Sequence, residues 1–391
     1  MIGASVSGAA CENKGAVARV VIDKVADHRV YWVALNLVLG DSLGPAQRIA
    51  ARFAPLEEAF QAGPSVLRGF GLNEAQAERL SSGKILEEAA RELERIEKRG
   101  IALLLRDDPA YPPYLREIYD PPPVLMCAGR SEVLSRPGVS IVGSRRPSPY
   151  GRAVAERLSR DLAERGLVVV SGLAIGIDAA AHWGALRGGL TTAVLGSGLN
   201  VPYPKENKKL MDKIVDCGGA VVTEFPLDAK PLGFHFPLRN RIISGLSMAL
   251  IVVEATRKSG ALISARFALE QNREVMAVPG NVSSELSAGA NWLIQTGAKL
   301  VQEWEDVAVE LPPPLRDELL AQAAGRGESR SEPSPEGLEV LALLREDGLT
   351  DIDDLADRSE RSISELPTVL LELELKGWVL QHPGKRFQRR P

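Results

Sequence analysis

The chain has few cysteines and no long apolar run, and both absences limit what it can be. Its only cysteines, Cys11, Cys127 and Cys217, are odd in number, lie far apart and lack C-x-x-C spacing. This pattern argues against a disulfide framework and a zinc site, and it is typical of a reducing compartment. No apolar run reaches the ~18–20 residues of a membrane span, and residues 1–28 lack the apolar core of a signal peptide. We therefore expect a cytoplasmic protein without a membrane anchor.

The chain also lacks an excess of positive charge. Its 47 lysines and arginines are outnumbered by 51 aspartates and glutamates, and the formal net charge is −4. A surface that is basic all over is thereby excluded, so any nucleic-acid site must be a local patch. Neither the G-x-G-x-x-G fingerprint nor the Walker A pattern occurs, and the four histidines have no metal-ligand spacing. The sequence thus predicts no bound cofactor and no metal.

Between residues 98 and 311, short apolar runs alternate regularly with helix patterns. Residues 139–142 and 167–170 are β-branched runs short enough for strands buried on both faces, and each precedes a glycine-containing turn and a helix pattern. The alternation predicts an α/β domain with a doubly wound, mostly parallel sheet. Sheets of this kind bind ligands at the carboxyl ends of their strands.

The segments on either side of this domain differ from it in composition. Residues 1–28 are small and weakly patterned, so we expect a disordered tail, and residues 29–97 predict a small helical domain. Residues 312–335 are rich in proline, glycine and serine, as in a linker. Residues 336–391 have the three helices and the hairpin of a winged helix. The expected recognition helix carries glutamates, the wrong sign of charge for a DNA groove, so DNA binding by this domain remains an open question.

Two turns, residues 143–146 and 171–178, follow the first two parallel strands. Each combines glycine with small or basic residues, so that backbone N–H groups and a helix N-terminus can meet an anion at the sheet edge. Arg145 adds a guanidinium suited to phosphate. We call this expected phosphate-binding edge, formed by the two turns and the loops after neighbouring strands, the crest.

Further small or basic sets follow later strands, and their number favours an extended ligand. One mononucleotide needs one or two such sets, whereas a nucleic-acid strand can use several along the edge. Within residues 236–241, a ring and two guanidiniums could stack on or hydrogen-bond an unpaired base. One alternative is a nucleotide-processing hydrolase on the same crest, with an acid and a base drawn from Asp178, Glu224 and Glu254. The other is a scaffold that acts only through protein contacts.

Eight sequence blocks between about residues 100 and 302 resemble the DprA/Smf family of DNA-processing proteins, bacterial recombination mediators of natural transformation. In chain order they are IVGSRRPSPYG, VSGLAIGIDAAAH, LGSGLNVPYPKEN, TEFP, FPLRNRIISGLS, VVEATRKSGALISA, AVPGNV and GANWLIQTGAKLV. Residues 29–97 look like the sterile-alpha-motif-like (SAM-like) domain often found ahead of that core. Residues 336–391 look like the winged-helix-like domain that follows it.

The resemblance implies an extended Rossmann-like fold that binds single-stranded DNA, forms a homodimer and loads the recombinase RecA onto the bound strand. It implies no catalytic turnover and therefore no catalytic residues. The P-G-G-x-G-T-x-x-E run of nucleotide-hydrolysing relatives is missing, which weakens the hydrolase alternative. Carried over by position, the residues that bind the strand would be Gly143, Ser144, Arg145, Gly172, Gly176, Lys205, Asn207, Arg239, Asn240 and Arg241.

Overall fold

The computed structural model describes residues 27–40, 44–327, 333–344, 348–359, 365–375, 378–382, 384 and 386–389. The expected tail lies outside these ranges up to residue 26. The chain divides into two compact units, one ending at Arg316 and the other beginning at Asp317. Within the described ranges, no helix is long and apolar enough to cross a membrane.

Helices form the N-terminal region of the first unit. They are α2 (His28–Leu39), α3 (Pro45–Arg52), α4 (Glu58–Gln61), α5 (Pro64–Arg68), α6 (Glu74–Leu80) and α7 (Gly83–Lys98). Local sequence sets where they begin. Asp27 caps α2 by accepting a hydrogen bond from the Arg29 backbone N–H, and Asn73 forms a capping box with Gln76 at the start of α6. The apolar faces of these helices meet in a core in which Leu35 is completely buried.

The rest of the first unit is organised around a nine-stranded sheet of order β1-β2-β6-β5-β4-β3-β7-β8-β9. Its strands are β1 (Ala102–Leu105), β2 (Val124–Gly129), β3 (Gly138–Val142), β4 (Val168–Ser171), β5 (Thr191–Val194), β6 (Ala220–Thr223), β7 (Ala249–Val252), β8 (Glu274–Ala277) and β9 (Lys299–Leu300). Neighbours from β6 to β9 are parallel, whereas β2 runs antiparallel to both β1 and β6. The order reverses between β3 and β7, which is the topological switch point of a doubly wound sheet.

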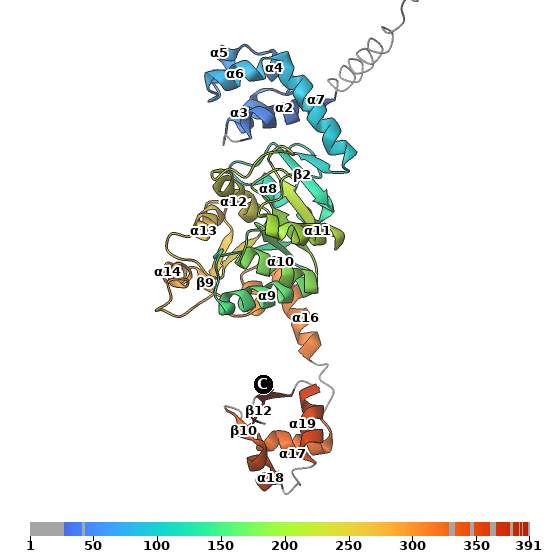
Figure 1. The fold of residues 1–391 in the computed structure, drawn as a ribbon, viewed down its shortest axis with the longest axis vertical. Helices are drawn as coiled ribbons and strands as arrows, with labels where there is room; N and C mark the ends of the chain where they lie inside the picture. The colour runs from blue at the N-terminus through green and yellow to red at the C-terminus, as the bar shows by residue number, and fades with distance from the viewer. Residues whose placement is uncertain are drawn as a thin grey trace, which may run out of the picture. The chain divides into compact units, whose positions relative to one another are not determined.

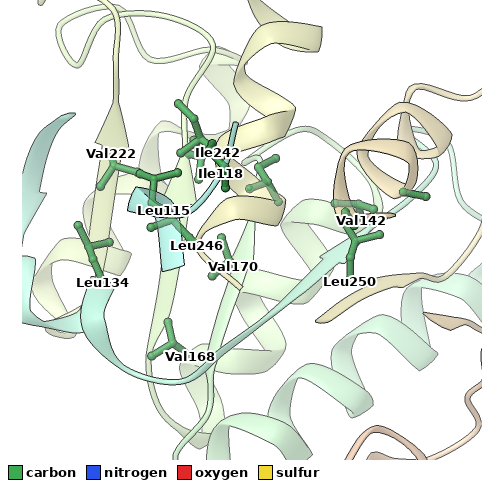
Figure 2. Packing of buried hydrophobic residues seen from close by; sticks show 14 of the residues in the cluster. Leu115, Ile118, Leu134, Val142, Val168, Val170, Val222, Ile242, Leu246 and Leu250 are labelled. Atoms are coloured by element: carbon green, nitrogen blue, oxygen red, sulfur yellow. The ribbon is translucent and has the colours of Figure 1, made fainter. Parts of the chain in front are cut away.

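Helices cover both faces of this sheet (Figure 1). On one face lie α9 (Pro149–Glu164), α10 (Ile177–Gly188) and α11 (Lys208–Asp216), and on the other α12 (His235–Gly245) packs on α13 (Gly260–Glu270). Side chains alternate along a strand, so Val194 belongs to the core beneath α12, and its neighbour Ala193 belongs to the core beneath α11. Figure 2 shows the first of these cores, with Ile242 of α12 near Leu115 of the short helix α8 (Pro113–Arg116).

Buried hydrogen bonds join the helical N-terminal region to the carboxyl edge of the sheet. Asn36 Nδ2 donates to the carbonyl oxygen of Glu224 at 2.8 Å, and the backbone N–H of Leu227 donates to Glu92 Oε1 at 2.8 Å. Glu224 directly follows β6, and Leu227 lies in the loop that begins there. The helical region therefore covers the carboxyl edge at the β6 side of the sheet.

Among its described residues from 333 onward, the second unit has three helices and a small sheet of order β10-β12-β11. Its elements are α17 (Pro335–Leu343), β10 (Thr350–Asp351), α18 (Ile352–Ser359), α19 (Leu366–Leu375), β11 (Val379–His382) and β12 (Arg386–Arg389). Helix α16 (Pro313–Gly327) lies within the expected linker, of which residues 328–332 are outside the described ranges. The predicted fold class is confirmed: a helical region, a mostly parallel doubly wound sheet and a winged helix.

Candidate nucleic-acid interface

The crest lies at the point where the strand order reverses. The turns after β3 and β4, together with α12 and the start of α13, surround a hollow of about 510 Å³. Its walls include Gly143 and Arg145 from the first turn, Ala174 from the second, and Arg239 and Asn240 from α12. The structure thus brings together residues from three segments that are far apart in sequence. Ligands of doubly wound sheets bind at this kind of place.

Two glycines let the turns of the crest lie against each other. Gly176 has a φ of +89°, and a Cβ there would lie 2.3 Å from the carbonyl oxygen of Ser144. A Cβ at Gly143 would lie 2.8 Å from Cγ1 of Ile177. The Ile177 N–H donates to the Ser144 carbonyl oxygen at 3.1 Å, which fastens the first turn to the start of α10. A side chain at either glycine would push the two turns apart.

Arg239 places a fixed positive charge in the wall of the crest. Its side chain is buried, and Nη1 donates to the carbonyl oxygens of Gly172, at 2.6 Å, and Val194. A Cβ on Gly172 would lie 2.5 Å from Nη1, so glycine is required here to make room for the guanidinium. Burial lowers the pKa of Arg239 to about 10, against the opposing effect of the Asp178 carboxylate, so the side chain is charged at neutral pH.

Asp178 holds the second turn in shape. Its Oδ2 accepts hydrogen bonds from the backbone N–H groups of Gly172, at 3.1 Å, and Ala174, at 3.4 Å. Burial raises the pKa of this carboxyl, while Arg239 and the two N–H groups act in the opposite direction. These contacts give the side chain a positioning role at the start of α10.

Arg145 is exposed above the crest and faces an aromatic ring. Its guanidinium carbon lies 5.6 Å from the centre of the Phe236 ring, and that of Arg239 lies 6.0 Å from the same centre. Tyr203 packs on Phe236 with the ring centres 5.5 Å apart. These four side chains line a second, smaller hollow of about 60 Å³ on the crest. Rings and cations in this arrangement can bind an unpaired base and its phosphate together.

The loop after β5 brings Lys205 and Asn207 to the same edge. Lys205 begins the short helix η2 (Lys205–Asn207) and is exposed, next to Pro204, which lines the smaller hollow. Asn207 Nδ2 donates to the carbonyl oxygen of Leu173 at 2.8 Å. Asn207 therefore ties this loop to the second turn, and Lys205 stands at the rim.

The N-terminus of α13 closes the larger hollow on its β7 side. Ser259 caps the helix by accepting a hydrogen bond from the Ala261 N–H at 3.3 Å, and Ser259, Gly260 and Ser264 line the hollow. The macrodipole of α13 places partial positive charge at this end. It adds to the field of the two arginines.

Arg241, unlike Arg239, lines neither hollow. Its Nη2 donates to Glu224 Oε2 at 2.6 Å, its Nε lies 3.9 Å from Asp120 Oδ2, and its side chain is buried. Residues two apart on a helix do not share a face, so one arginine of the 239–241 run faces the crest and the other faces the protein interior. We therefore leave Arg241 out of the contacts that we propose below.

The carboxylates of the hydrolase alternative all have partners within the protein. Glu254 accepts hydrogen bonds from the Ser148 N–H, at 2.9 Å, and the Ser148 hydroxyl, at 2.5 Å, at the start of α9. Glu224 pairs with Arg241, and Asp178 holds the second turn. Among the described residues, no group of three His, Cys, Asp or Glu side chains could hold a metal ion.

One aromatic residue of the crest, Tyr203, and the direction of Arg241 differ from the expectations drawn from the sequence. Tyr203 lies at the smaller hollow, and its place two residues before Lys205 in the loop after β5 was the available signal. Helical spacing by itself predicts the direction of Arg241, because Arg239 and Arg241 are two residues apart on α12 and cannot both face the sheet edge.

Comparison with known proteins gives a family match in each unit. The model of the family DNA recombination-mediator protein A matches residues 102–312, and that of the DprA winged helix domain matches residues 324–385. Protein Smf of Escherichia coli (strain K12) is 40% identical over 324 residues, which are 82% of this chain and 85% of that protein.

Solved structures that are similar to the chain include two of DNA processing protein A. The X-ray structure of DNA processing protein A from Streptococcus pneumoniae has a TM-score of 0.63 and 36% identity, and the match covers 73% of this chain and 98% of that one. A structure of DNA processing protein A from Helicobacter pylori, solved for its single-stranded DNA binding mode, has a TM-score of 0.50 and 30% identity. That match covers 57% of this chain and 96% of the other.

Proposed function

The chain belongs to the DNA recombination-mediator protein A (DprA/Smf) family, and we propose that it binds single-stranded DNA along the crest and loads the recombinase RecA onto the bound strand. The observation that carries the proposal is the arrangement of two arginines, one buried and one exposed, around the Phe236 ring at the switch point. The single-stranded DNA binding described for the Helicobacter pylori relative supports the same ligand here.

The strand contacts that we propose fall to five of the predicted residues, namely Ser144, Arg145, Lys205, Arg239 and Asn240. Four others shape the crest that presents them, namely Gly143, Gly172, Gly176 and Asn207. Phosphates would meet the cations and the α13 N-terminus, and a base would lie on the exposed face of the Phe236 and Tyr203 pair. A duplex keeps its bases stacked inside, so a site of this kind favours an unpaired strand.

Family membership supports the partners that we propose here. We propose that the protein acts in the cytoplasm as a homodimer through its Rossmann-like domain, during uptake of DNA in natural transformation. We also propose that it has no catalytic turnover, because Asp178, Glu224 and Glu254 are each engaged in hydrogen bonds within the protein. Hydrolysis of a nucleotide that is abolished by Asp178→Asn or Glu254→Gln would instead support the hydrolase alternative.

Fluorescence anisotropy with labelled oligonucleotides tests the DNA-binding part. Wild type should bind a single strand more tightly than a duplex of equal length, and Arg145→Ala should weaken single-strand binding by about 1–3 kcal/mol. Arg187→Ala is the matched control, because Arg187 lies in the last turn of α10, at the end of that helix away from the crest. Equal affinity of wild type and Arg145→Ala would move the DNA site away from the crest.

RecA loading needs its own assay. RecA is added to single-stranded DNA already coated with a single-stranded DNA-binding protein, and filament assembly is followed by RecA ATP hydrolysis. We expect wild type to shorten the lag and Arg145→Ala to do so less. Normal strand binding without any effect on the lag would separate DNA binding from loading and count against the second.

A further inference from the structure

A third hollow, of about 530 Å³, lies between the helical N-terminal region and the sheet, apart from the crest. Its walls are mostly apolar and include the rings of Tyr31 on α2 and Phe53 at the end of α3. Its rim is charged, with Arg106 and Asp107 directly after β1 and Arg116 on α8. We call it the β1 hollow.

The β1 hollow lies at the same edge of the sheet as the crest. β1 is antiparallel to β2, and β2 is antiparallel to β6, so β1 runs in the direction of β6 and of the parallel strands beyond it. The residues after β1 therefore emerge at the same edge as those after β4 and β3, with β2, β6 and β5 between them. Four strand spacings of ~4.8 Å, or about 19 Å, separate β1 from β4. A stacked strand with one phosphate every ~3.4 Å needs about six nucleotides for the straight distance, and more to pass the helical region docked after β6.

The aromatic wall of the β1 hollow is held rigid from behind. The ring centres of Tyr31 and Phe60 are 5.3 Å apart, and those of Phe53 and Phe70 are 5.6 Å apart. The guanidinium carbon of Arg52 lies 5.6 Å from the centre of the Phe53 ring. Half-buried rings that are braced on one side and border a hollow on the other are suitable platforms for unpaired bases.

Arg106 is half-buried at the rim and has no internal counter-charge. Within the described ranges its side chain forms no hydrogen bond and no salt bridge. A partly buried guanidinium is normally paired, because loss of water around a charge is unfavourable unless a partner replaces it. Glu57 and Asp107 are exposed on the same rim and weaken its field. The β1 hollow therefore fits one phosphate with its base better than a run of phosphates.

We propose that the β1 hollow is a second site for single-stranded DNA, in which an unpaired base stacks on Tyr31 or Phe53 and the adjoining phosphate meets Arg106. The proposal rests on the proposed function of the crest, from which the strand would pass around the helical region docked after β6 to reach the hollow. Stacking supplies most of the binding at the β1 hollow and phosphate contacts supply most of it at the crest. Binding at the hollow therefore requires bases and responds weakly to salt.

The test uses the full chain and compares Arg106→Gln with Arg91→Gln. Arg91 is an exposed residue of α7 that lines neither the crest nor the β1 hollow, so its substitution removes the same charge from the same region. Anisotropy is measured with a short oligo-dT that fills only the crest and with a longer one that also reaches the β1 hollow. Arg106→Gln should weaken binding of the longer strand about fivefold or more and leave the short one unchanged, while Arg91→Gln should change neither.

Two further measurements locate the contact. Abasic sites in the part of the longer strand beyond the crest should lower wild-type affinity below that of Arg106→Gln, because stacking supplies most of the binding at the hollow. Irradiation of strands with 5-iodouracil at successive positions should attach them to Tyr31 or Phe53. The proposal would be overturned if neither Arg106→Gln nor the abasic sites changed the affinity, or if the crosslinks avoided both Tyr31 and Phe53. The hollow would then be a candidate site for a protein partner instead. Failure of the proposed function is distinct, because wild type would then bind neither strand.

Discussion

Removing either partner of the buried ion pair between Glu224 and Arg241 should lower the free energy of unfolding. The two losses should differ in how they depend on pH. The side chains are 2% and 6% exposed, with Oε2 and Nη2 2.6 Å apart. Breaking such a pair by removing one partner costs about 3–5 kcal/mol, because the other charge stays buried. Asp120 lies 3.9 Å from Arg241 Nε and retains part of the attraction. We therefore expect Glu224→Gln to lower the free energy of unfolding by about 3 kcal/mol.

The cost of the reverse variant, Arg241→Met, should depend on pH. Burial raises the pKa of the Glu224 carboxyl, and loss of the opposing guanidinium raises it further, so Glu224 takes up a proton on folding. A folded-state pKa above the unfolded value means that stability is kept at low pH and lost as pH rises beyond about 4.3. In Glu224→Gln the guanidinium cannot lose its proton and the amide does not titrate, so the stability of this variant should not follow a Glu224 titration between about pH 5 and about pH 8.

Urea unfolding of the full chain, followed by tryptophan fluorescence at these two pH values, measures both effects. A double variant, Glu224→Leu with Arg241→Met, should recover most of the loss, since apolar residues replace a buried pair at little cost. Lys98→Met is the surface control, because Lys98 and Glu94 form an exposed pair whose loss should change stability by less than about 0.5 kcal/mol. Losses below about 1 kcal/mol in both single variants, or a loss in Arg241→Met that ignores pH, would refute the reasoning.

Three further predictions concern the crest and the core beneath it. Gly176→Ala should lower the free energy of unfolding by about 1–3 kcal/mol, because position 176 has a φ of +89° and a Cβ there would clash with the Ser144 carbonyl oxygen. Gly83→Ala is the control, because a Cβ at Gly83 has no atom within 4 Å, and thermal melts compare the two variants. Burial lowers the pKa of His182 to about 3. The stability that the neutral His182 ring contributes is therefore fully present above about pH 6.5, and it is lost as pH falls, by up to ~1.4 kcal/mol per pH unit. His182→Leu should flatten the fall of urea-derived stability between about pH 6.5 and 4, and an unchanged slope would contradict this. Loss of the Arg145 charge should reduce the slope of log affinity against log salt by about 1 in anisotropy titrations, and an identical slope would count against a phosphate contact.

The sheet and the position of the crest were predictable from the sequence because local features determine them. Short β-branched runs that end in glycine turns lead to strands buried on both faces, and parallel strands bring their carboxyl ends to one edge. Gly143 and Gly176 mark two of those ends, and both are needed for the close approach of the turns. These signals lie within a few residues of the strands that they describe.

The features that the sequence did not predict depend on contacts between distant segments. The antiparallel place of β2 beside β6 and the docking of Asn36 on Glu224 are set by tertiary packing. The β1 hollow exists only because the helical region docks beside the residues after β1. The glycine at 172 is required by an arginine 67 positions away, a relation that no local pattern carries.

The immobility of Arg239 has a consequence for how a strand moves. A surface lysine swings with a phosphate as the strand shifts, but the Arg239 guanidinium is fixed by the carbonyl oxygens of Gly172 and Val194. A strand that slides along the crest must release one phosphate from this charge before the next arrives. Its energy therefore rises and falls with a period of one nucleotide, and the strand pauses in register. Under the proposed function, such pauses would keep a strand still while a second protein assembles on it.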